Sequence, residues 1–171
     1  LLRLMGAWWG KNARTSISRF ILGQIMKRRG VVRHIGLSSH TPELVNRALD
    51  MGILDMLMFS VNPGYDYRHG AYGIGSVDER MALYRRCEKE GVGISVMKAF
   101  SGGQLLSAKT SPFKQALTEC QCIQYALDKP GVLSVLPGIR SKMDLERILG
   151  FLESCAGIFS SLEYMPPVWR R

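Results

Sequence analysis

The chain has 171 residues, a mass of 19.1 kDa, 46% hydrophobic and 22% charged residues, and a formal net charge of +9. This length suits one globular domain, residues 1–171, and the composition excludes a disordered, collagen-like or repeat chain. No apolar run approaches the roughly 18 to 20 residues that a membrane-spanning helix needs. We therefore expect a soluble, cytoplasmic protein that does not bind membranes.

The positive charge is concentrated near the N-terminus. Residues 1–42 hold eight basic residues and no acidic one, whereas the rest of the chain is nearly balanced. Such a segment could bind nucleic acid, direct the chain to an organelle, or contact phosphate or an acidic partner. No nucleic-acid-binding motif accompanies it, so nucleic acid is not the expected partner. The chain begins with Leu rather than Met, which suggests a fragment, a processed chain or an incomplete gene model.

The cysteine content argues against both a disulfide framework and a metal site. Without a secretory signal pattern, four cysteines in a chain of this size favour reduced thiols. One close pair, Cys120-Gln-Cys122, lacks the C-x-x-C spacing of metal and redox motifs and falls in a stretch with helical character. We predict that these cysteines pack in the core and that no metal is bound.

The first half of the chain predicts a helix and a strand, followed by a second helix and a second strand. Glycine or serine after each run, and Pro42 with Glu43 at the start of one helix, mark the element ends. A loop rich in Gly and Tyr follows and runs to Gly75. The predicted elements are a helix over 16–29, a strand over 31–38, a helix over 41–51 and a strand over 53–61.

The second half repeats the same order of elements. It predicts a helix over 78–90, a strand over 93–98, a glycine turn over 101–103, a helix over 111–128, a strand over 132–136 and a helix over 141–152. Residues 1–15 and 153–171 carry no clear periodicity and are treated as flanking segments of a core over about 31–152.

Four strands, each followed by a helix, predict an α/β fold with a parallel sheet. A doubly wound sheet and a β/α barrel both satisfy this order. The glycine-rich G-x-G-x-x-G motif of dinucleotide-binding doubly wound folds is absent, which favours the barrel. Because a complete (β/α)8 TIM barrel needs about 250 residues, we predict a partial barrel of about four units.

The motifs at the carboxyl ends of the four strands resemble, in order and spacing, the second half of an aldo/keto reductase barrel, strands five to eight. The resemblance spans about residues 20–150 and is closest to the branch that often carries a C-terminal iron–sulfur extension, whose cysteine-rich run is absent here. The motifs are Gly36-Leu-Ser-Ser-His40, Ser60-Val-Asn-Pro63, Met97-Lys-Ala-Phe-Ser-Gly-Gly103 and Leu136-Pro-Gly-Ile-Arg-Ser141.

The resemblance implies a nicotinamide cofactor, usually NADPH, with NADH as an alternative, for the interconversion of carbonyls and alcohols without a metal. By position, Ser38 and Ser39 match the pair that holds the nicotinamide carboxamide, although a serine at a strand end can equally cap the next helix. Lys98 stands where many members have an aromatic residue that stacks on the nicotinamide, and Phe100 belongs to the same segment.

Two further segments match the phosphate-binding parts of the family. Ser101, Gly102 and Gly103 match the loop that crosses the pyrophosphate, where glycine lets backbone N–H groups approach an anion. Guanidinium and hydroxyl groups at a helix start suit a phosphate. The segment that matches the adenosine 2′-phosphate region consists of Gly138, Ile139, Arg140 and Ser141.

No catalytic residue is assigned, because the family's proton-donating Tyr and its Asp, Lys and His supports lie in the first four barrel units. The resemblance therefore implies the cofactor-binding C-terminal half of a reductase for a small carbonyl substrate, inactive alone. An N-terminal half or self-association would close the barrel edges. The alternative is a non-catalytic NADPH-binding or regulatory barrel remnant.

Overall fold

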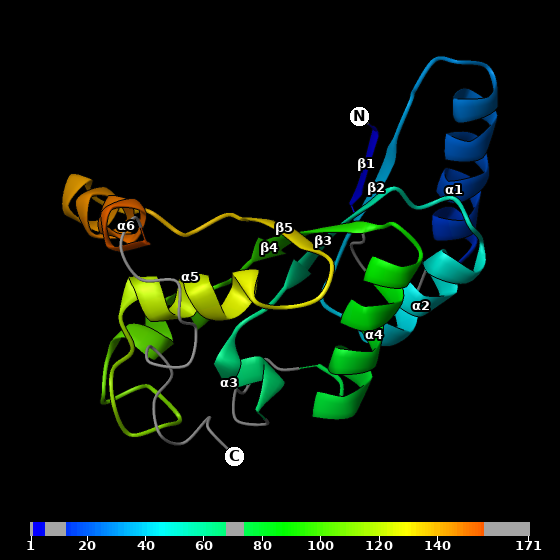
Figure 1. Ribbon diagram of the computed structural model, residues 1–171. Coiled ribbons are helices and arrows are strands. Elements are labelled where there is room, and N and C mark those ends of the chain that lie inside the picture. Colours follow the sequence, from blue (N-terminus) through cyan, green and yellow to red (C-terminus); the bar gives the residue numbers. More distant parts are fainter. Residues whose placement is uncertain (1, 6–12, 68–73, 156–171) are drawn as a thin grey trace.

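The computed structural model describes residues 2–5, 13–67 and 74–155, and its centre is one parallel sheet with helices packed against it (Figure 1). In chain order the elements are β1 (Leu2–Met5), α1 (Ala13–Arg28), β2 (Ile35–Ser39), α2 (Pro42–Asp50), β3 (Met56–Ser60), α3 (Pro63–Asp66), α4 (Val77–Lys89), β4 (Gly93–Met97), the 3-10 turns η1 (Ser101–Leu106), α5 (Glu119–Leu127), β5 (Val132–Val135) and α6 (Lys142–Cys155).

The four predicted strands are present as β2 to β5, and the structure adds a fifth. Strand β1, where no element was predicted, pairs in parallel with β2, so that Leu2 lies opposite Ile35. Its four residues are too few for a periodic pattern, and its strand conformation depends on pairing with a segment more than 30 residues away. Strand β2 also begins at Ile35 rather than at residue 31.

Helix α5 is shorter than the predicted helix over 111–128. It begins at Glu119, because the Thr118 hydroxyl accepts the N–H of Gln121 and the Gln121 side chain accepts the N–H of Thr118. This capping box fixes a helix start. Part of the predicted Gly- and Tyr-rich loop is helical, as α3, while residues 68–73 of that loop and the flanking residues 6–12 and 156–171 lie outside the described residues.

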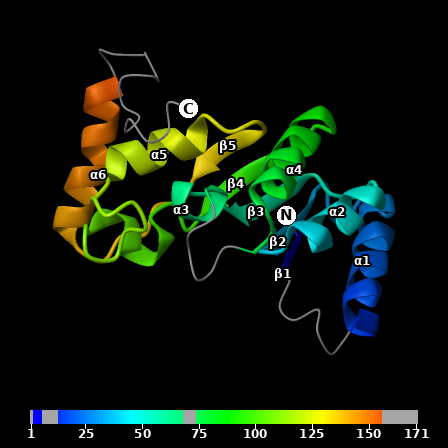
Figure 2. The same ribbon diagram turned by 90° about the horizontal axis from the view of Figure 1, so that it is seen from below.

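The strand order identifies the sheet as part of a barrel. The strands lie in the order β1-β2-β3-β4-β5, each parallel to the next. A doubly wound sheet would reverse direction at a switch point, where strands adjacent in the sheet are not consecutive in the chain. Helices α2, α4 and α5 lie along one face of the sheet (Figures 1 and 2). The predicted partial (β/α)8 barrel is therefore confirmed as the fold class.

The two faces of the sheet differ in chemistry. On the face toward the helices, aligned residues such as Leu57, Phe59 and Val96 are completely buried and form one core with α2, α4 and α5. In strands β2 to β4 the opposite face is made of glycine, serine and methionine, with Ser38, Met58 and Ser95 in one row across the three strands. Because successive side chains alternate between faces, this second face corresponds to the interior of a closed barrel.

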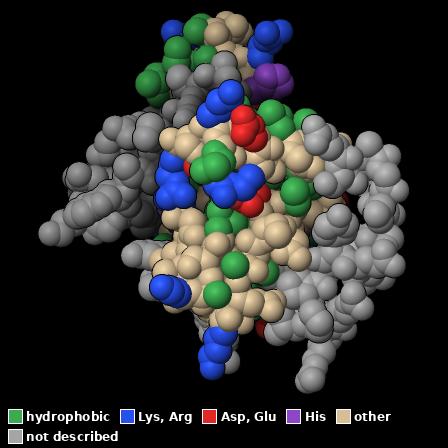
Figure 3. Space-filling model, turned by 90° about the vertical axis from the view of Figure 1, so that its left-hand side faces the viewer, with side chains coloured by type: hydrophobic (Ala, Val, Ile, Leu, Met, Phe, Trp, Pro, Cys, Tyr) green, Lys and Arg blue, Asp and Glu red, His purple; other side chains and the backbone are tan. Residues whose placement is uncertain are grey.

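Both outer strands of the described sheet pair on one side only. Strand β1 pairs with β2 and β5 pairs with β4, and no further described strand joins either edge. Apolar side chains are exposed next to the β5 edge, and Figure 3, which views this side of the molecule, shows hydrophobic side chains interspersed with basic and acidic ones. The exposed apolar residues on β5, the connection after it and α6 are Leu133, Leu136, Ile139, Met143, Leu145, Leu149 and Leu152.

A fully buried ion pair fixes α3 at the carboxyl end of β3. Arg80 and Asp66 are both 0% exposed, and Arg80 Nε donates to Asp66 Oδ1 at 2.7 Å. Tyr84 and Tyr125 donate their hydroxyls to the two oxygens of Asp66, at 2.8 and 3.0 Å. Burial, and then the nearby charge of Asp66, raises the pKa of both tyrosines, so both remain protonated donors.

The described cysteines are packed into the helices rather than joined in disulfides. Burial raises the pKa of Cys87 to about 11 and that of Cys122 to about 12, which keeps both thiols protonated near neutral pH. Among residues 2–5, 13–67 and 74–155, no group of three His, Cys, Asp or Glu side chains is arranged to hold a metal ion. None of the described helices has the length and apolar character needed to cross a membrane.

At the amino end of the sheet, Asp55 joins α1 to β2 and β3, and this contact predicts an acid-sensitive step in stability. Lys27 Nζ lies 2.6 Å from Asp55 Oδ2, which also accepts the N–H of Ile35 at 2.8 Å. Burial alone would raise the pKa of Asp55, but the hydrogen bonds from Lys27 and Ile35 and the charges of Lys27 and His34 outweigh it and lower the pKa.

A lowered folded-state pKa means that the contribution of Asp55 to stability is complete above the unfolded pKa of about 4 and is lost as pH falls through the folded value. Asp55→Asn is expected to unfold more easily than the wild type at pH 7, by roughly 1 kcal/mol because the pair is partly exposed. This difference should shrink below about pH 4. Urea unfolding at several pH values measures it, and a difference that does not change with pH would contradict the assignment.

Candidate functional site

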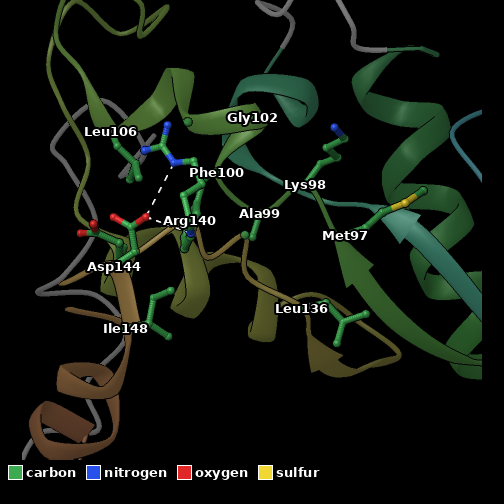
Figure 4. A pocket seen from close by; sticks show the side chains of 13 residues that line it. Met97, Lys98, Ala99, Phe100, Gly102, Leu106, Leu136, Arg140, Asp144 and Ile148 are labelled. Carbon is green, nitrogen blue, oxygen red and sulfur yellow. Dashed lines mark hydrogen bonds and ion pairs between the residues drawn. The ribbon is translucent and has the colours of Figure 1, made fainter. Parts of the chain in front are cut away.

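A cavity of about 300 Å³ lies where β4 and β5 end, and it brings together most of the predicted phosphate-binding segments (Figure 4). In parallel β/α barrels, this carboxyl end of the strands is where binding and catalytic groups gather. The lining residues are Met97, Lys98, Ala99, Phe100, Gly102, Gly103, Leu106, Glu119, Leu136, Gly138, Arg140, Asp144 and Ile148.

The β4 side of the cavity is a strained turn. Lys98 and Ser101 have φ values of 61° and 51°, and Gly102 and Gly103 follow with 69° and 93°. Left-handed backbone is uncommon for residues other than glycine and persists only where the surrounding structure holds it. Here the buried Asn62 donates from Nδ2 to the carbonyl oxygen of Lys98 at 2.9 Å. The turn therefore has a fixed shape on which backbone groups can meet a ligand.

The β5 side of the cavity leads into α6. The Ser141 hydroxyl accepts the N–H of Asp144 at 3.1 Å, and Asp144 Oδ2 accepts the N–H of Arg140 at the same distance. These bonds hold the start of α6, while the Arg140 side chain remains 80% exposed. Arg140 thus presents a solvated guanidinium at the rim of the cavity, facing Asp144 in Figure 4.

Two acidic residues in this wall were not expected from the sequence. Asp144 Oδ1 lies 2.6 Å from Arg147 Nη2, and Arg147 Nε lies 3.1 Å from Glu119 Oε1. The hydrogen bond from Arg147, then that from the Arg140 N–H, lowers the pKa of Asp144, so it is ionised near neutral pH. The spacing Ser141-x-x-Asp144 is a helix-start signal and could have indicated Asp144. Nothing local in the sequence places Glu119 here, because it comes from α5.

The two serines predicted to hold the nicotinamide carboxamide, Ser38 and Ser39, lie outside the lining of this cavity. Ser39 is 4% exposed, and its hydroxyl accepts the N–H of Thr41 at 3.1 Å, at the start of α2. The N-cap residue of α2 is Thr41, so this bond lies just before the helix and is not the capping role that the sequence left as the alternative. Ser38 is half-buried on the barrel-interior face of the sheet. A contact between either serine and a cofactor remains a prediction.

Three other predicted residues do not line the cavity. Ser101 is 5% exposed, and its hydroxyl lies 3.3 Å from Gln104 Oε1 inside η1. Ile139 is exposed in the connection after β5, and Ser141 caps α6. The structure thus brings six of the predicted residues into the lining of one cavity: Lys98, Phe100, Gly102, Gly103, Gly138 and Arg140. The other five lie outside that lining: Ser38, Ser39, Ser101, Ile139 and Ser141.

Two basic residues at this end of the sheet, Lys98 and Arg140, can contact an anionic ligand. Burial, and then the positive charges of Lys98 and Arg80, lowers the pKa of His40, so that this imidazole is neutral at pH 7. Lys98 forms no ion pair with any of the described acidic residues, and it is one of the residues that line the cavity. An exposed guanidinium, an ammonium and a glycine turn together can bind phosphate groups.

Comparison with known proteins supports the fold. No protein-family model and no curated protein sequence matches the chain. Among solved structures, the chain is similar to the holo form of aldo-keto reductase AKR11C1 from Bacillus halodurans, with a TM-score of 0.63 and 18% identity over 95% of this chain and 57% of that one. The apo form gives a TM-score of 0.55 and 19% identity over 85% and 54%. The chain thus spans a little over half the length of these structures, and the predicted resemblance is confirmed at the level of fold: the chain has the architecture of part of an aldo-keto reductase barrel.

Proposed function

We propose that this chain forms the part of an aldo/keto reductase-type oxidoreductase that binds a nicotinamide cofactor, NADPH with NADH as the alternative. The observation that supports the proposal best is the cavity at the ends of β4 and β5, which combines the left-handed turn at Gly102 and Gly103 with Lys98 and Arg140. The likeness in fold to AKR11C1, whose holo form is one of the matching structures, supports the same assignment.

In this proposal the chain's own residues bind and orient the cofactor. The Gly102 N–H of the turn would face the pyrophosphate, whereas the Gly103 N–H is already donated to the Phe100 carbonyl oxygen at 2.9 Å. The Arg140 guanidinium would pair with the 2′-phosphate. The bound cofactor would supply the hydride for reduction of a small carbonyl substrate. The resemblance assigns none of the family's catalytic residues to this chain. The proton donor would therefore come from the first four units of the barrel, which this chain does not match.

Removal of the Arg140 guanidinium is the direct test. Arg140→Ala is expected to weaken NADPH binding at least tenfold, because a charge-assisted contact with phosphate is lost. NADH, which has no 2′-phosphate, should be affected much less. Titration of the full chain with each cofactor, followed by cofactor fluorescence, measures both affinities. Arg85→Ala, which removes an exposed arginine from α4, is the matched control. A folded wild-type chain that binds neither cofactor would contradict the proposal.

The two unpaired edges of the described sheet affect whether this chain can catalyse a reaction alone. Each edge leaves main-chain donors and acceptors unpaired in the described sheet, and exposed apolar side chains lie beside β5. We propose that an N-terminal half-barrel or a second copy of this chain closes the sheet for catalysis. Size-exclusion chromatography of the titrated sample distinguishes self-association from a chain that binds the cofactor as a monomer. Cofactor binding without any complementation would favour the non-catalytic alternative.

A further inference from the structure

Arg140, the proposed partner of the 2′-phosphate, already faces a carboxylate. Asp144 Oδ2 lies 3.6 Å from Arg140 Nε and accepts the backbone N–H of the same residue at 3.1 Å. Both residues line the cavity, and Figure 4 shows their side chains pointing toward one another. An anion brought to this guanidinium would therefore meet a negative charge that is already in place.

The position of this carboxylate is fixed from several sides. The Asp144 side chain is only 13% exposed, and its second oxygen, Oδ1, is held by Arg147 at 2.6 Å. Arg147 is itself held by Glu119, whose carboxylate lies 3.1 Å from the Arg147 Nε. Asp144 cannot turn away from an incoming ligand without breaking these contacts. Among the described charged residues that line the cavity, Lys98 and Arg140 are balanced by Glu119 and Asp144.

We propose that Asp144 is a specificity-determining residue that limits the preference for a cofactor carrying a 2′-phosphate. This inference rests on the proposed cofactor function and deepens it. A 2′-phosphate paired with Arg140 would lie near the ionised Asp144, and like charges a few ångströms apart repel. The ribose hydroxyl of NADH carries no charge and avoids this repulsion. Asp144 thereby reduces the advantage that Arg140 gives to NADPH.

A competing explanation is that Asp144 serves only to hold the start of α6. Asparagine separates the two roles, because its side-chain oxygen can still accept the Arg140 N–H while the negative charge is removed. NADH is the internal control, since damage to the cavity by a distorted α6 would weaken the binding of both cofactors. Glu146→Gln is the matched control on the same helix, because Glu146 is 62% exposed, pairs with Lys142 and does not line the cavity.

The experiment titrates the full wild-type chain, Asp144→Asn and Glu146→Gln with NADPH and with NADH at low ionic strength. Asp144→Asn is expected to tighten NADPH binding about fivefold, the effect of removing one nearby like charge at a solvated site. NADH binding should change less than twofold, and Glu146→Gln should match the wild type. The gain for NADPH should become smaller in 1 M salt, where charges are screened within about 3 Å.

Three results would overturn the inference. Unchanged NADPH binding in Asp144→Asn would show that the carboxylate does not act on the phosphate. Equal tightening of both cofactors would indicate a general effect of charge, and weaker binding of both would indicate a structural role alone. In these cases the proposed cofactor function stands. Binding of neither cofactor by any folded variant, wild type included, would overturn that function and this inference together.

Discussion

Replacing Arg80 with methionine should lower the free energy of unfolding by about 3–5 kcal/mol, the usual cost of leaving one partner of a buried ion pair alone. The substitution leaves Asp66 without its cationic partner, in a site where both residues are 0% exposed. It also removes donors to Tyr84 Oη and to the main-chain oxygens of Ser60 and Ile74. Arg80 further lies 4.9 Å from the centre of the Phe59 ring, so packing is lost as well.

Arg86→Met is the matched control, since it removes an arginine from the same helix. Arg86 pairs with Asp50 and Glu90 at the surface, and such pairs contribute about 1 kcal/mol or less. Urea unfolding of both variants gives the comparison, and similar losses would contradict the burial of the Arg80–Asp66 pair. If Arg80→Met does not fold, Tyr84→Phe removes a single hydroxyl from the cluster and should cost about 1–2 kcal/mol.

The buried cluster marks a limit of prediction from sequence. The helix over 78–90 was expected from its glycine end and its polar residues, and α4 occupies almost the same range. The same polarity suggests a solvated helix face, yet Arg80 is fully buried. Its ion-pair partner Asp66 comes from α3, 14 residues away in the chain. Asp66 in turn accepts the hydroxyl of Tyr125 from α5, 59 residues further along. Helix ends depend on local residues, whereas burial of a charge depends on which distant segments meet it.

The site shows the same division between local and distant signals. The turn at Gly102 and Gly103 and the exposed Arg140 were predicted from residues that lie together in the sequence, and both line the cavity. Glu119 was missed because it reaches the cavity from another helix. A serine at the end of a strand can bind a ligand or bond to the neighbouring backbone, and the sequence does not distinguish the two. In the structure the Ser39 hydroxyl accepts the N–H of Thr41, just before α2. Strand β1 was missed because its conformation depends on its pairing with β2.

Asn62 carries the second large effect, because it connects α3 to the cavity. It is 0% exposed, its Oδ1 accepts the N–H of Tyr65 at 2.9 Å, and its Nδ2 donates to the Lys98 carbonyl at 2.9 Å. Asn62→Ala should lower the free energy of unfolding by about 2–3 kcal/mol, since it removes a helix cap and leaves buried polar groups without partners. It should also weaken cofactor binding, because the left-handed backbone at Lys98 loses its support.

Asn62→Ser separates these two effects. Serine can still cap α3 by accepting the N–H of Tyr65, but its shorter side chain carries no amide to donate to Lys98. We expect most of the stability to be retained while NADPH binding weakens about fivefold, roughly the loss of one hydrogen bond that holds the turn. Asn46→Ala, which removes from α2 the acceptor of a hydrogen bond from Arg86, should cost about 1 kcal/mol of stability and leave NADPH binding unchanged. If Asn62→Ser binds NADPH as tightly as the wild type, the strained turn does not need Asn62, and its shape must instead come from the glycines that follow it.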